Sequence, residues 1–315
     1  MVCWELKTLS GKVGSMVKRF SIMAVLSMLF LPCAAIIGMA GAALYMRVKL
    51  DPVILISSWA IVFGIYGLNR FTDVEDLVNN PQRRMFFKNN RFAFHAILAS
   101  LYLSVVLLLL TNRFTQVHFF ILLTGIAYSI RIIPFFDQNG KLLYKRLKEI
   151  PFAKSLAVAL IWGNAYFTIN LALYPQWQGD ILEIVLFIIS FTLVVFVNTN
   201  FLDIIDIAGD RITEIPTIPA QYGIRNTLLF AIALPSIVWI LIITILFSAG
   251  WVKNWSIVFL IINALYPVFY IGGYYLKLIP KKSVEIAADS CALVYSVGLL
   301  CLFFVQDSVL MSKLI

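Results

Sequence analysis

Two short stretches of the sequence gather acidic side chains in a chain that is otherwise poor in charge. The first stretch, GLNRFTDVEDLVNNPQR, contains Asn69, Asp73, Glu75 and Asp76. The second, NTNFLDIIDIAGDR, contains Asp203, Asp206 and Asp210. Each stretch lies where a long apolar segment ends, and acids at a membrane boundary are expensive unless they hold a cation. The two stretches are therefore candidates for a site that binds cations.

The spacing within each stretch predicts that the acids share one helical face. Asn69, Asp73 and Asp76 are spaced i, i+4 and i+7, and the second set is spaced i, i+3 and i+7. Mg²⁺ takes oxygen ligands and is usually held by one or two carboxylates together with substrate phosphates. Two opposed acidic faces thus predict a lipid diphosphate bridged by magnesium. We expect the metal ligands to be Asp73, Asp76, Asp203, Asp206 and Asp210, and the catalytic residues to be Asp73, Asp206 and Asp210.

The composition indicates a polytopic membrane protein. Of 315 residues, 61% are hydrophobic and 13% are charged, and the mean hydropathy is +0.92. We predict an all-α membrane protein, a bundle of about nine transmembrane helices forming a single membrane domain over residues 1–315, because nine stretches are long and apolar enough to span a bilayer. The predicted spans are 20–46, 51–68, 92–111, 116–133, 152–173, 181–201, 226–249, 254–276 and 285–309.

The basic residues predict the topology. With the amino terminus in the cytoplasm, most of the 25 Lys and Arg residues fall on the cytoplasmic side. Those left outside are Arg47, Lys49, Arg113, Lys253 and Lys313. Both acidic stretches then open to the cytoplasm, and the carboxyl terminus faces outward. The basic amino-terminal segment, 1–19, is predicted to be a cytoplasmic interfacial helix, with a targeting segment as the alternative.

A long basic loop lies between the two acidic stretches. The segment IRIIPFFDQNGKLLYKRLKEIPFAK contains five basic residues that could clamp a diphosphate and stabilise it as it departs: Arg131, Lys145, Arg146, Lys148 and Lys154. The alternative is that they only orient the loop in the cytoplasm. Lys145 and Lys148 are spaced i, i+3, which favours a shared helical face. The residues that we assign to substrate binding are Asn69, Arg70, Arg83, Lys145, Arg146, Lys148, Asn198 and Arg211.

These motifs resemble those of the UbiA superfamily of intramembrane prenyltransferases. The first stretch is similar to the family's NDxxDxxxD followed by NxPxR, with LVNNPQR at 77–83, and DIIDIAGDR at 203–211 is similar to its DxxDxxxGD. The first motif departs in two ways. Arg70 stands where the family has its first Asp, and Asp76 comes one residue early, so either Asp76 or Glu75 is the ligand. Asp76 is the choice if the helix continues regularly, because Glu75 then points about 100° away.

The resemblance implies a Mg²⁺-dependent prenyltransferase of the membrane that moves an isoprenoid group from an isoprenyl diphosphate to an aromatic or other lipophilic acceptor. A terpene cyclase of the same superfamily, which needs no acceptor, is the first alternative. A non-catalytic or transport protein is the second, and Asp289 in the ninth predicted span is the acid that fits it. A phosphatidyltransferase motif overlaps DIIDIAGDR, but Ile207 replaces its required glycine. The positive charge indicates membrane attraction, and no nucleic-acid partner is expected.

Overall fold

The computed structural model of the chain describes residues 28–136, 139–250 and 254–312. The predicted amino-terminal segment, 1–19, lies outside the described residues. In chain order the elements are the helix Met28–Tyr45, α2 (Pro52–Thr72), α3 (Asp76–Asn79), α4 (Pro81–Asn89), α5 (Arg91–Leu110), α6 (Gln116–Ser129), β1 (Ile133–Phe136), β2 (Leu142–Lys145), η1 (Leu147–Glu149), α7 (Ala153–Leu173), α8 (Ile181–Ile205), α9 (Ile207–Ile212), α10 (Ile218–Leu228), η2 (Leu229–Ala233), α11 (Leu234–Ser248), α12 (Asn254–Tyr275), α13 (Lys281–Asp289) and α14 (Cys291–Ser312).

The long helices match the predicted spans. Six described helices are long and apolar enough to cross a membrane, and the pair Ser283–Asp289 and Cys291–Val305, bent by 43°, would make a seventh. Two shorter apolar helices, Gln116–Ser129 and Ile237–Ser248, coincide with two further predicted spans. The chain is thus an all-α, multi-pass membrane protein, as predicted, while the number nine remains a prediction.

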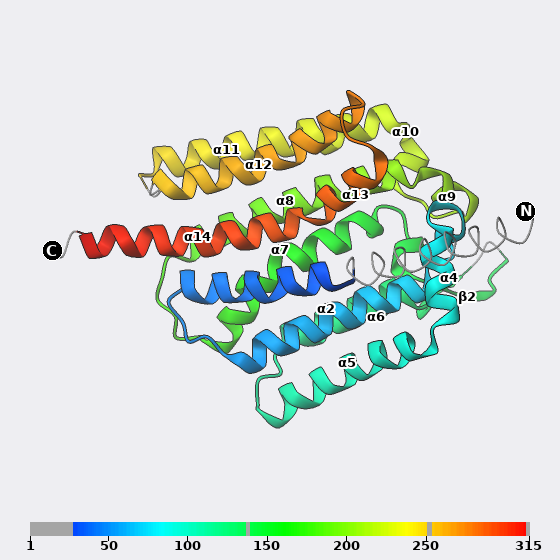
Figure 1. Cartoon of the computed structure of the whole chain (residues 1–315), viewed down its shortest axis with the longest axis horizontal. Helices are drawn as coiled ribbons and strands as arrows, with labels where there is room; N and C mark the ends of the chain where they lie inside the picture. The colour runs from blue at the N-terminus through cyan, green and yellow to red at the C-terminus, as the bar shows by residue number, and fades with distance from the viewer. Residues whose placement is uncertain (1–27, 137–138, 251–253, 313–315) are drawn as a thin grey trace, which may run out of the picture.

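The long helices lie side by side in one bundle. In Figure 1, α5 forms one edge and α11 with α12 the opposite edge, and the view from behind shows the same order. Small residues allow close packing between neighbours: a Cβ on Gly163 of α7 would lie 1.9 Å from the Thr192 hydroxyl of α8, and one on Gly64 of α2 would lie 2.3 Å from Leu101 of α5. These contacts pack α2 against α5 and α8 against α7, and α2 and α8 are the helices in which the two acidic stretches begin.

The ends of α2 and α8 meet at one end of the bundle. There the short helices α4 and α9 lie close to the β-hairpin (Figure 1). A hydrogen bond joins the two acidic stretches directly, because the side-chain oxygen of Asn79 in α3 accepts from the backbone N–H of Gly209 in α9 at 3.0 Å. Segments about 130 residues apart in sequence are therefore held against each other.

The basic loop is not a helix. Its first part forms the antiparallel hairpin of β1 and β2, with Ile133 opposite Lys145 and Gly140 at φ 74° in the turn. Lys145 ends β2, whereas Lys148 lies in the 3-10 turn η1. The expectation that these two lysines share a helical face is wrong, because the segment between them changes from strand to 3-10 turn.

Candidate functional site: two acidic clusters at the mouth of a membrane cavity

A cavity of about 300 Å³ runs into the bundle between the helix Met28–Tyr45, α2, α6, α7 and α8. Its inner walls are apolar and include Met39, Ile61, Ile121 and Ile169. Its mouth is polar. Asn69 and all five predicted metal ligands line it: Asp73, Asp76, Asp203, Asp206 and Asp210. The structure thus brings the two acidic stretches to one opening, which leads into the apolar interior of the cavity.

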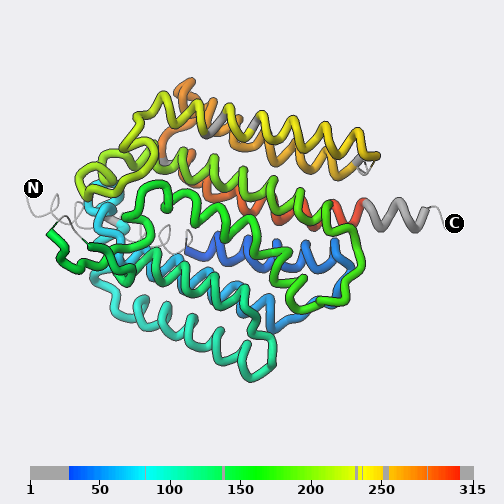
Figure 2. Tube along the Cα trace, turned by 180° about the vertical axis from the view of Figure 1, so that it is seen from behind, coloured from blue at the N-terminus to red at the C-terminus, as the bar shows by residue number. Residues whose placement is uncertain are grey.

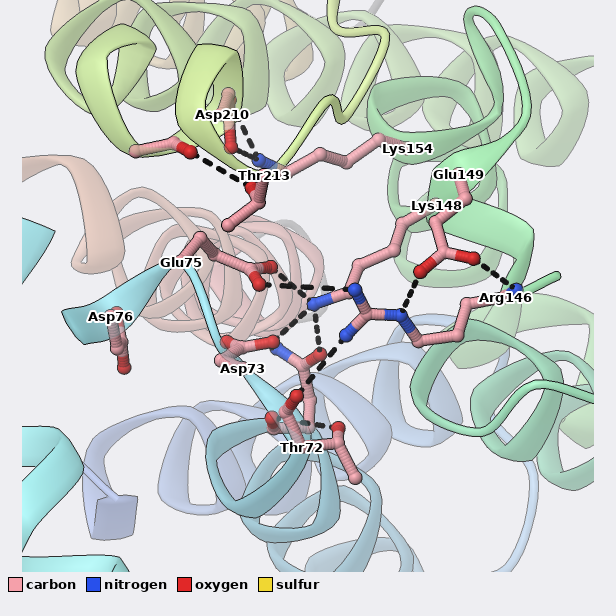
Figure 3. Close-up of polar contacts among 12 residues, drawn as sticks. Thr72, Asp73, Glu75, Asp76, Arg146, Lys148, Glu149, Lys154, Asp210 and Thr213 are labelled. Atoms are coloured by element: carbon pink, nitrogen blue, oxygen red, sulfur yellow. Dashed lines mark hydrogen bonds and ion pairs between the residues drawn. The ribbon is translucent and has the colours of Figure 1, made fainter. Parts of the chain in front are cut away.

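The first acidic cluster, which we define as Asp73, Glu75 and Asp76, is buried. All three residues are at most 5% exposed. Asp73 and Glu75 both contact the ammonium of Lys148, which reaches them from η1. The same ammonium donates to the side-chain oxygen of Asn69 at 3.3 Å, and Asn69 donates to Asp73 at 3.0 Å. Figure 3 shows Asp73 and Glu75 pointing toward Lys148.

Asp76 lies apart from this contact. Arg83 holds it with two hydrogen bonds, 2.7 Å from Nε and 2.5 Å from the terminal nitrogen, and its side chain points away from Lys148 (Figure 3). The expectation that Asp76 shares a helical face with Asn69 and Asp73 is wrong. The helix α2 ends at Thr72, Asp73 has ψ 98°, and a new helix begins at Asp76. The break turns Glu75 toward Asp73 and turns Asp76 away.

Arginines stabilise the break by binding the last carbonyls of α2. The final turn of a helix leaves carbonyl oxygens without partners in the helix, and cations are favourable there. Arg84 donates to the carbonyl of Phe71, and Arg146 donates to that of Thr72 at 3.1 Å. At the end of α8, Lys281 donates in the same way to the carbonyl of Ile205 at 3.3 Å. Both helices that carry the acidic stretches thus end on side-chain cations.

The second acidic cluster, which we define as Asp203, Asp206 and Asp210, has one close cation. Lys154, near the start of α7, lies 2.9 Å from Asp203 and 3.1 Å from both oxygens of Asp210. Ser155 adds a hydrogen bond to Asp203 at 2.9 Å. Asp203 and Asp210 converge even though α8 ends at Ile205, because α9 resumes after a single junction residue.

That junction residue is Asp206, and it is the most accessible acid of the two clusters. Its side chain is 32% exposed, and the ammonium of Lys281 lies 3.8 Å away. No side-chain hydrogen bond engages it among the described residues. Its carboxylate therefore faces the cavity mouth free to bind a further cation.

The carboxyl pKa values of the two clusters shift in opposite directions. Burial would raise the pKa of Asp73, but the Lys148 ammonium, with help from Arg70, holds that pKa below its usual value. In the second cluster, burial raises the pKa of Asp210 to about 7 although Lys154 opposes the rise, and burial also raises the pKa of Asp206. The cations beside Asp73 thus outweigh the effect of its burial on its pKa, whereas those beside Asp206 and Asp210 do not.

The two clusters also differ in the number of cations beside them. Four cations lie within 4 Å of the three acids of the first cluster: Arg70, Arg83, Arg146 and Lys148. Among the side chains that the structure describes, Lys154 and Lys281 are the two within that distance of the second cluster. A divalent cation would thus offset an uncompensated charge at the second cluster but not at the first.

No three acidic, His or Cys side chains in the described part of the chain converge closely enough to hold a metal without help. A Mg²⁺ ion at the second cluster would therefore need substrate oxygens to complete its ligand set. This is the usual arrangement for that ion. Asp206 offers oxygens without a side-chain hydrogen bond there among the described residues, and Asp210 offers oxygens that it shares with the single ammonium of Lys154. At the first cluster the donor set does not fit, since Lys148 and Arg83 already bind the carboxylates.

The remaining predicted substrate residues divide into two groups. Arg70, Arg83 and Asn198 line the cavity; Arg70 lies over the ring of Tyr66, and Asn198 accepts a hydrogen bond from Tyr270 at 2.8 Å. Lys145, Arg146 and Arg211 do not line it. Lys145 lies over the ring of Phe135 in the hairpin, Arg146 is bound by Glu149 and Thr72, and Arg211 is exposed on α9.

Several cavity residues were not assigned to the site from the sequence. Lys154 is one of the five basic residues predicted to clamp a diphosphate, but it is not in the predicted substrate-binding set. Glu285 and Asp289, one turn apart in α13, line the cavity beside the second cluster. Asp289 lies at the 43° bend between the last two helices. The spacing of Glu285 and Asp289, i and i+4 in an apolar segment, is the signal that could have placed both in the site.

The comparisons with known proteins find similarity in structure alone. No family model matches the chain, and no curated protein matches it. A UbiA homologue from Aeropyrum pernix K1, solved without ligand, superposes with a TM-score of 0.55 at 18% identity, covering 89% of this chain and 98% of that one. A digeranylgeranylglyceryl phosphate synthase superposes with a TM-score of 0.52 at 15% identity, covering 90% of this chain and 98% of the synthase. The resemblance first seen in the acidic motifs is thus confirmed in three dimensions: this chain has the fold of the UbiA superfamily.

Proposed function

We propose that this protein is an intramembrane prenyltransferase, which takes an isoprenyl diphosphate and transfers the isoprenoid group to a lipophilic acceptor. The observation that carries the proposal is the meeting of two acidic clusters, from helices about 130 residues apart, at the mouth of one apolar cavity. A charged head group would lie at the mouth, and its hydrocarbon tail would lie among Ile61, Ile121 and Ile169. The similar structures belong to UbiA proteins, which supports the proposal.

Magnesium fits the mouth at the second cluster. Asp206 and Asp210 would hold the ion together with diphosphate oxygens, and the ion would supply charge neutralisation for the leaving diphosphate. Lys154 lies beside these acids, so its ammonium can bind a diphosphate oxygen once Asp210 engages a metal. Arg70 and Arg83 line the opposite wall, where their guanidinium groups face the same space.

The reaction breaks the bond between the allylic carbon and the diphosphate oxygen. The bonding electrons leave with the diphosphate, and the allylic cation that remains is captured by the acceptor, which then loses a proton. Water would quench this cation, so the cavity must exclude solvent. Tyr66, Tyr128, Trp162 and Tyr166 line the cavity, and aromatic faces stabilise a nearby cation.

The topology belongs to the same proposal. The short helices α4 and α9 and the strand β2 lie at one end of the bundle (Figure 1), next to the acidic residues that line the cavity mouth. The positive residues assign this end to the cytoplasm, where soluble precursors and magnesium are available. We place the amino terminus and this mouth in the cytoplasm and the carboxyl terminus outside.

The test is a product assay on the purified protein in lipid. Geranyl, farnesyl and geranylgeranyl diphosphates are supplied with Mg²⁺, with and without a lipid extract, and the products are identified by mass. Release of diphosphate together with a prenylated lipid supports transfer. A cyclic hydrocarbon formed without the extract would favour the cyclase alternative, and no release with any of the three substrates would contradict the proposal.

A further inference from the structure

We infer that Lys148 takes the place of a metal ion at the first acidic cluster, so that the site binds its divalent cation on the second cluster alone. This inference rests on the proposed function, because it concerns how the same mouth would bind a diphosphate. The first motif is the part of the sequence that predicted a metal there. In the structure, a lysine ammonium lies between its acids.

The contacts of Lys148 use the whole capacity of its ammonium. An ammonium has three N–H donors, and this one meets three oxygens, on Asn69, Asp73 and Glu75. The side chain of Lys148 is 1% exposed. No donor is left to bind a phosphate, so the position of this lysine suits neutralising the acids rather than clamping the substrate.

The backbone around Lys148 is fixed by other bonds. Glu149 accepts from the backbone N–H of Arg146 at 3.0 Å and from its Nε at 2.7 Å, which closes the turn η1 around Lys148. Arg146 in turn binds the Thr72 carbonyl at the end of α2. The turn that carries Lys148 is thus attached to the end of α2, directly before Asp73, and this attachment fixes the position of the ammonium.

The rest of the first cluster leaves too few ligands for a metal, because only one buried carboxylate oxygen, Glu75 Oε2, has no hydrogen bond among the described residues, and a terminal nitrogen of Arg146 lies 3.9 Å from it. Asp76 is bound by Nε and one terminal nitrogen of Arg83, and four cations lie within 4 Å of the three acids. The second cluster differs. Lys154 is 17% exposed, its contacts of 2.9 to 3.1 Å are of ordinary length, and Asp206 remains open. The geometry therefore assigns one divalent cation to each chain, held beside Asp206 and Asp210.

The test counts metal ions and needs no turnover. The full-length protein in detergent micelles is titrated with Mn²⁺, which accepts the same oxygen ligands as Mg²⁺, in the presence of inorganic pyrophosphate, and free Mn²⁺ is measured by electron paramagnetic resonance. We expect one bound Mn²⁺ per chain for the wild type and two for Lys148→Met, whose side chain has a similar length and no charge. Lys148→Arg, which retains the charge, should bind one.

Further variants make each outcome decisive. Asp206→Asn should bind none, and the double variant Asp206→Asn/Lys148→Met should bind one, at the first cluster. Two ions in the wild type would overturn the inference, and that result does not depend on whether Lys148→Met folds. One ion in a folded Lys148→Met, judged by its thermal unfolding, would also overturn it. The count is independent of prenyl transfer, so a failed product assay would contradict the proposed function and leave this measurement intact.

Discussion

The two acidic clusters have similar spacing in the sequence, yet they form different environments. The first is closed: its acids are buried, and each is bound by Lys148 or Arg83. The second is open at one acid: Lys154 joins Asp203 and Asp210, which are also buried, while Asp206 faces the mouth. A carboxylate motif alone therefore does not identify a metal site. The cations that the fold places beside each motif decide which motif keeps uncompensated negative charge that a metal ion can bind.

The backbone explains the difference between the clusters. After Thr72 the chain leaves the helix for three residues, and this break turns Asp76 toward Arg83 and admits Lys148 beside Glu75. After Ile205 the interruption is only Asp206 itself. The helical spacing of the second motif is thus nearly preserved, while that of the first is lost.

The largest effect is expected at the open cluster. Asp206→Asn removes the accessible carboxylate, and we expect turnover to fall about 1000-fold, which is roughly 4 kcal/mol of transition-state stabilisation. The protein should fold normally, because Asp206 has no close partner among the described side chains other than Lys281 at 3.8 Å. Turnover of a prenyl diphosphate and thermal unfolding are the two measurements.

Glu183→Gln is the matched control for that variant. Glu183 lies in the first turn of the same helix, α8, at the end away from the mouth, and should be silent. A fully active Asp206→Asn would mean that the open cluster is not where the diphosphate is activated, and the contrast between the clusters would lose its functional meaning.

A smaller loss of turnover is expected at the closed cluster. Glu75→Gln keeps the shape of the side chain but removes one of the two negative charges on Lys148, so we expect about a tenfold loss of turnover and a lower unfolding temperature, since a buried charge loses part of its compensation. With a continuous helix, Asp76→Ala would be the damaging change and Glu75→Ala a silent one. The break in α2 reverses that order for turnover. If Glu75→Gln matches the wild type in both rate and unfolding temperature, Lys148 does not depend on Glu75.

A third variant tests the contact between the clusters without removing any charge. A Cβ on Gly209 would lie 2.4 Å from the side chain of Asn79. Gly209→Ala should therefore push α9 away from α3 and lower turnover severalfold by misaligning the two clusters. Asn79→Ala in the same background relieves the crowding and should restore part of the rate. A rate unchanged by Gly209→Ala would show that the alignment of the clusters tolerates movement.

The smallest effect is expected in the hairpin. Lys145 is three residues from Lys148, but its ammonium lies 3.7 Å from the centroid of the Phe135 ring and away from the cavity. Lys145→Ala should leave turnover within about twofold of the wild type. A loss comparable to that of Glu75→Gln would mean that the hairpin moves onto the substrate during the reaction.

The sequence predicted the parts of this molecule that depend on local pattern. Long apolar segments predicted the helices, and clustered acids predicted that residues near 73 and 206 would meet at one mouth. The hairpin was missed although its signal is present: Asn139-Gly140 lies between IPFF and LLYK, a typical sequence for a tight turn between strands.

The ion pairs could not be predicted in the same way. Lys148 was assigned to the substrate, because spacing shows that a basic loop is near an acidic one but not which lysine enters which cluster. The break after Thr72 has no Gly or Pro to mark it. It depends on Arg84 and Arg146, which bind the last carbonyls of α2 from 13 and 74 residues away in the chain. Such contacts are set by tertiary packing.

The most direct measurement is a structure of the protein with Mn²⁺ and farnesyl thiodiphosphate, an analogue that resists cleavage, in which anomalous scattering locates the metal. We predict a single metal peak beside Asp206 and Asp210, the diphosphate at the mouth with its tail among Ile61 and Ile121, and Lys148 still bound to Asp73 and Glu75. A metal peak between Asp73 and Asp76, with Lys148 displaced onto the phosphates, would contradict this prediction.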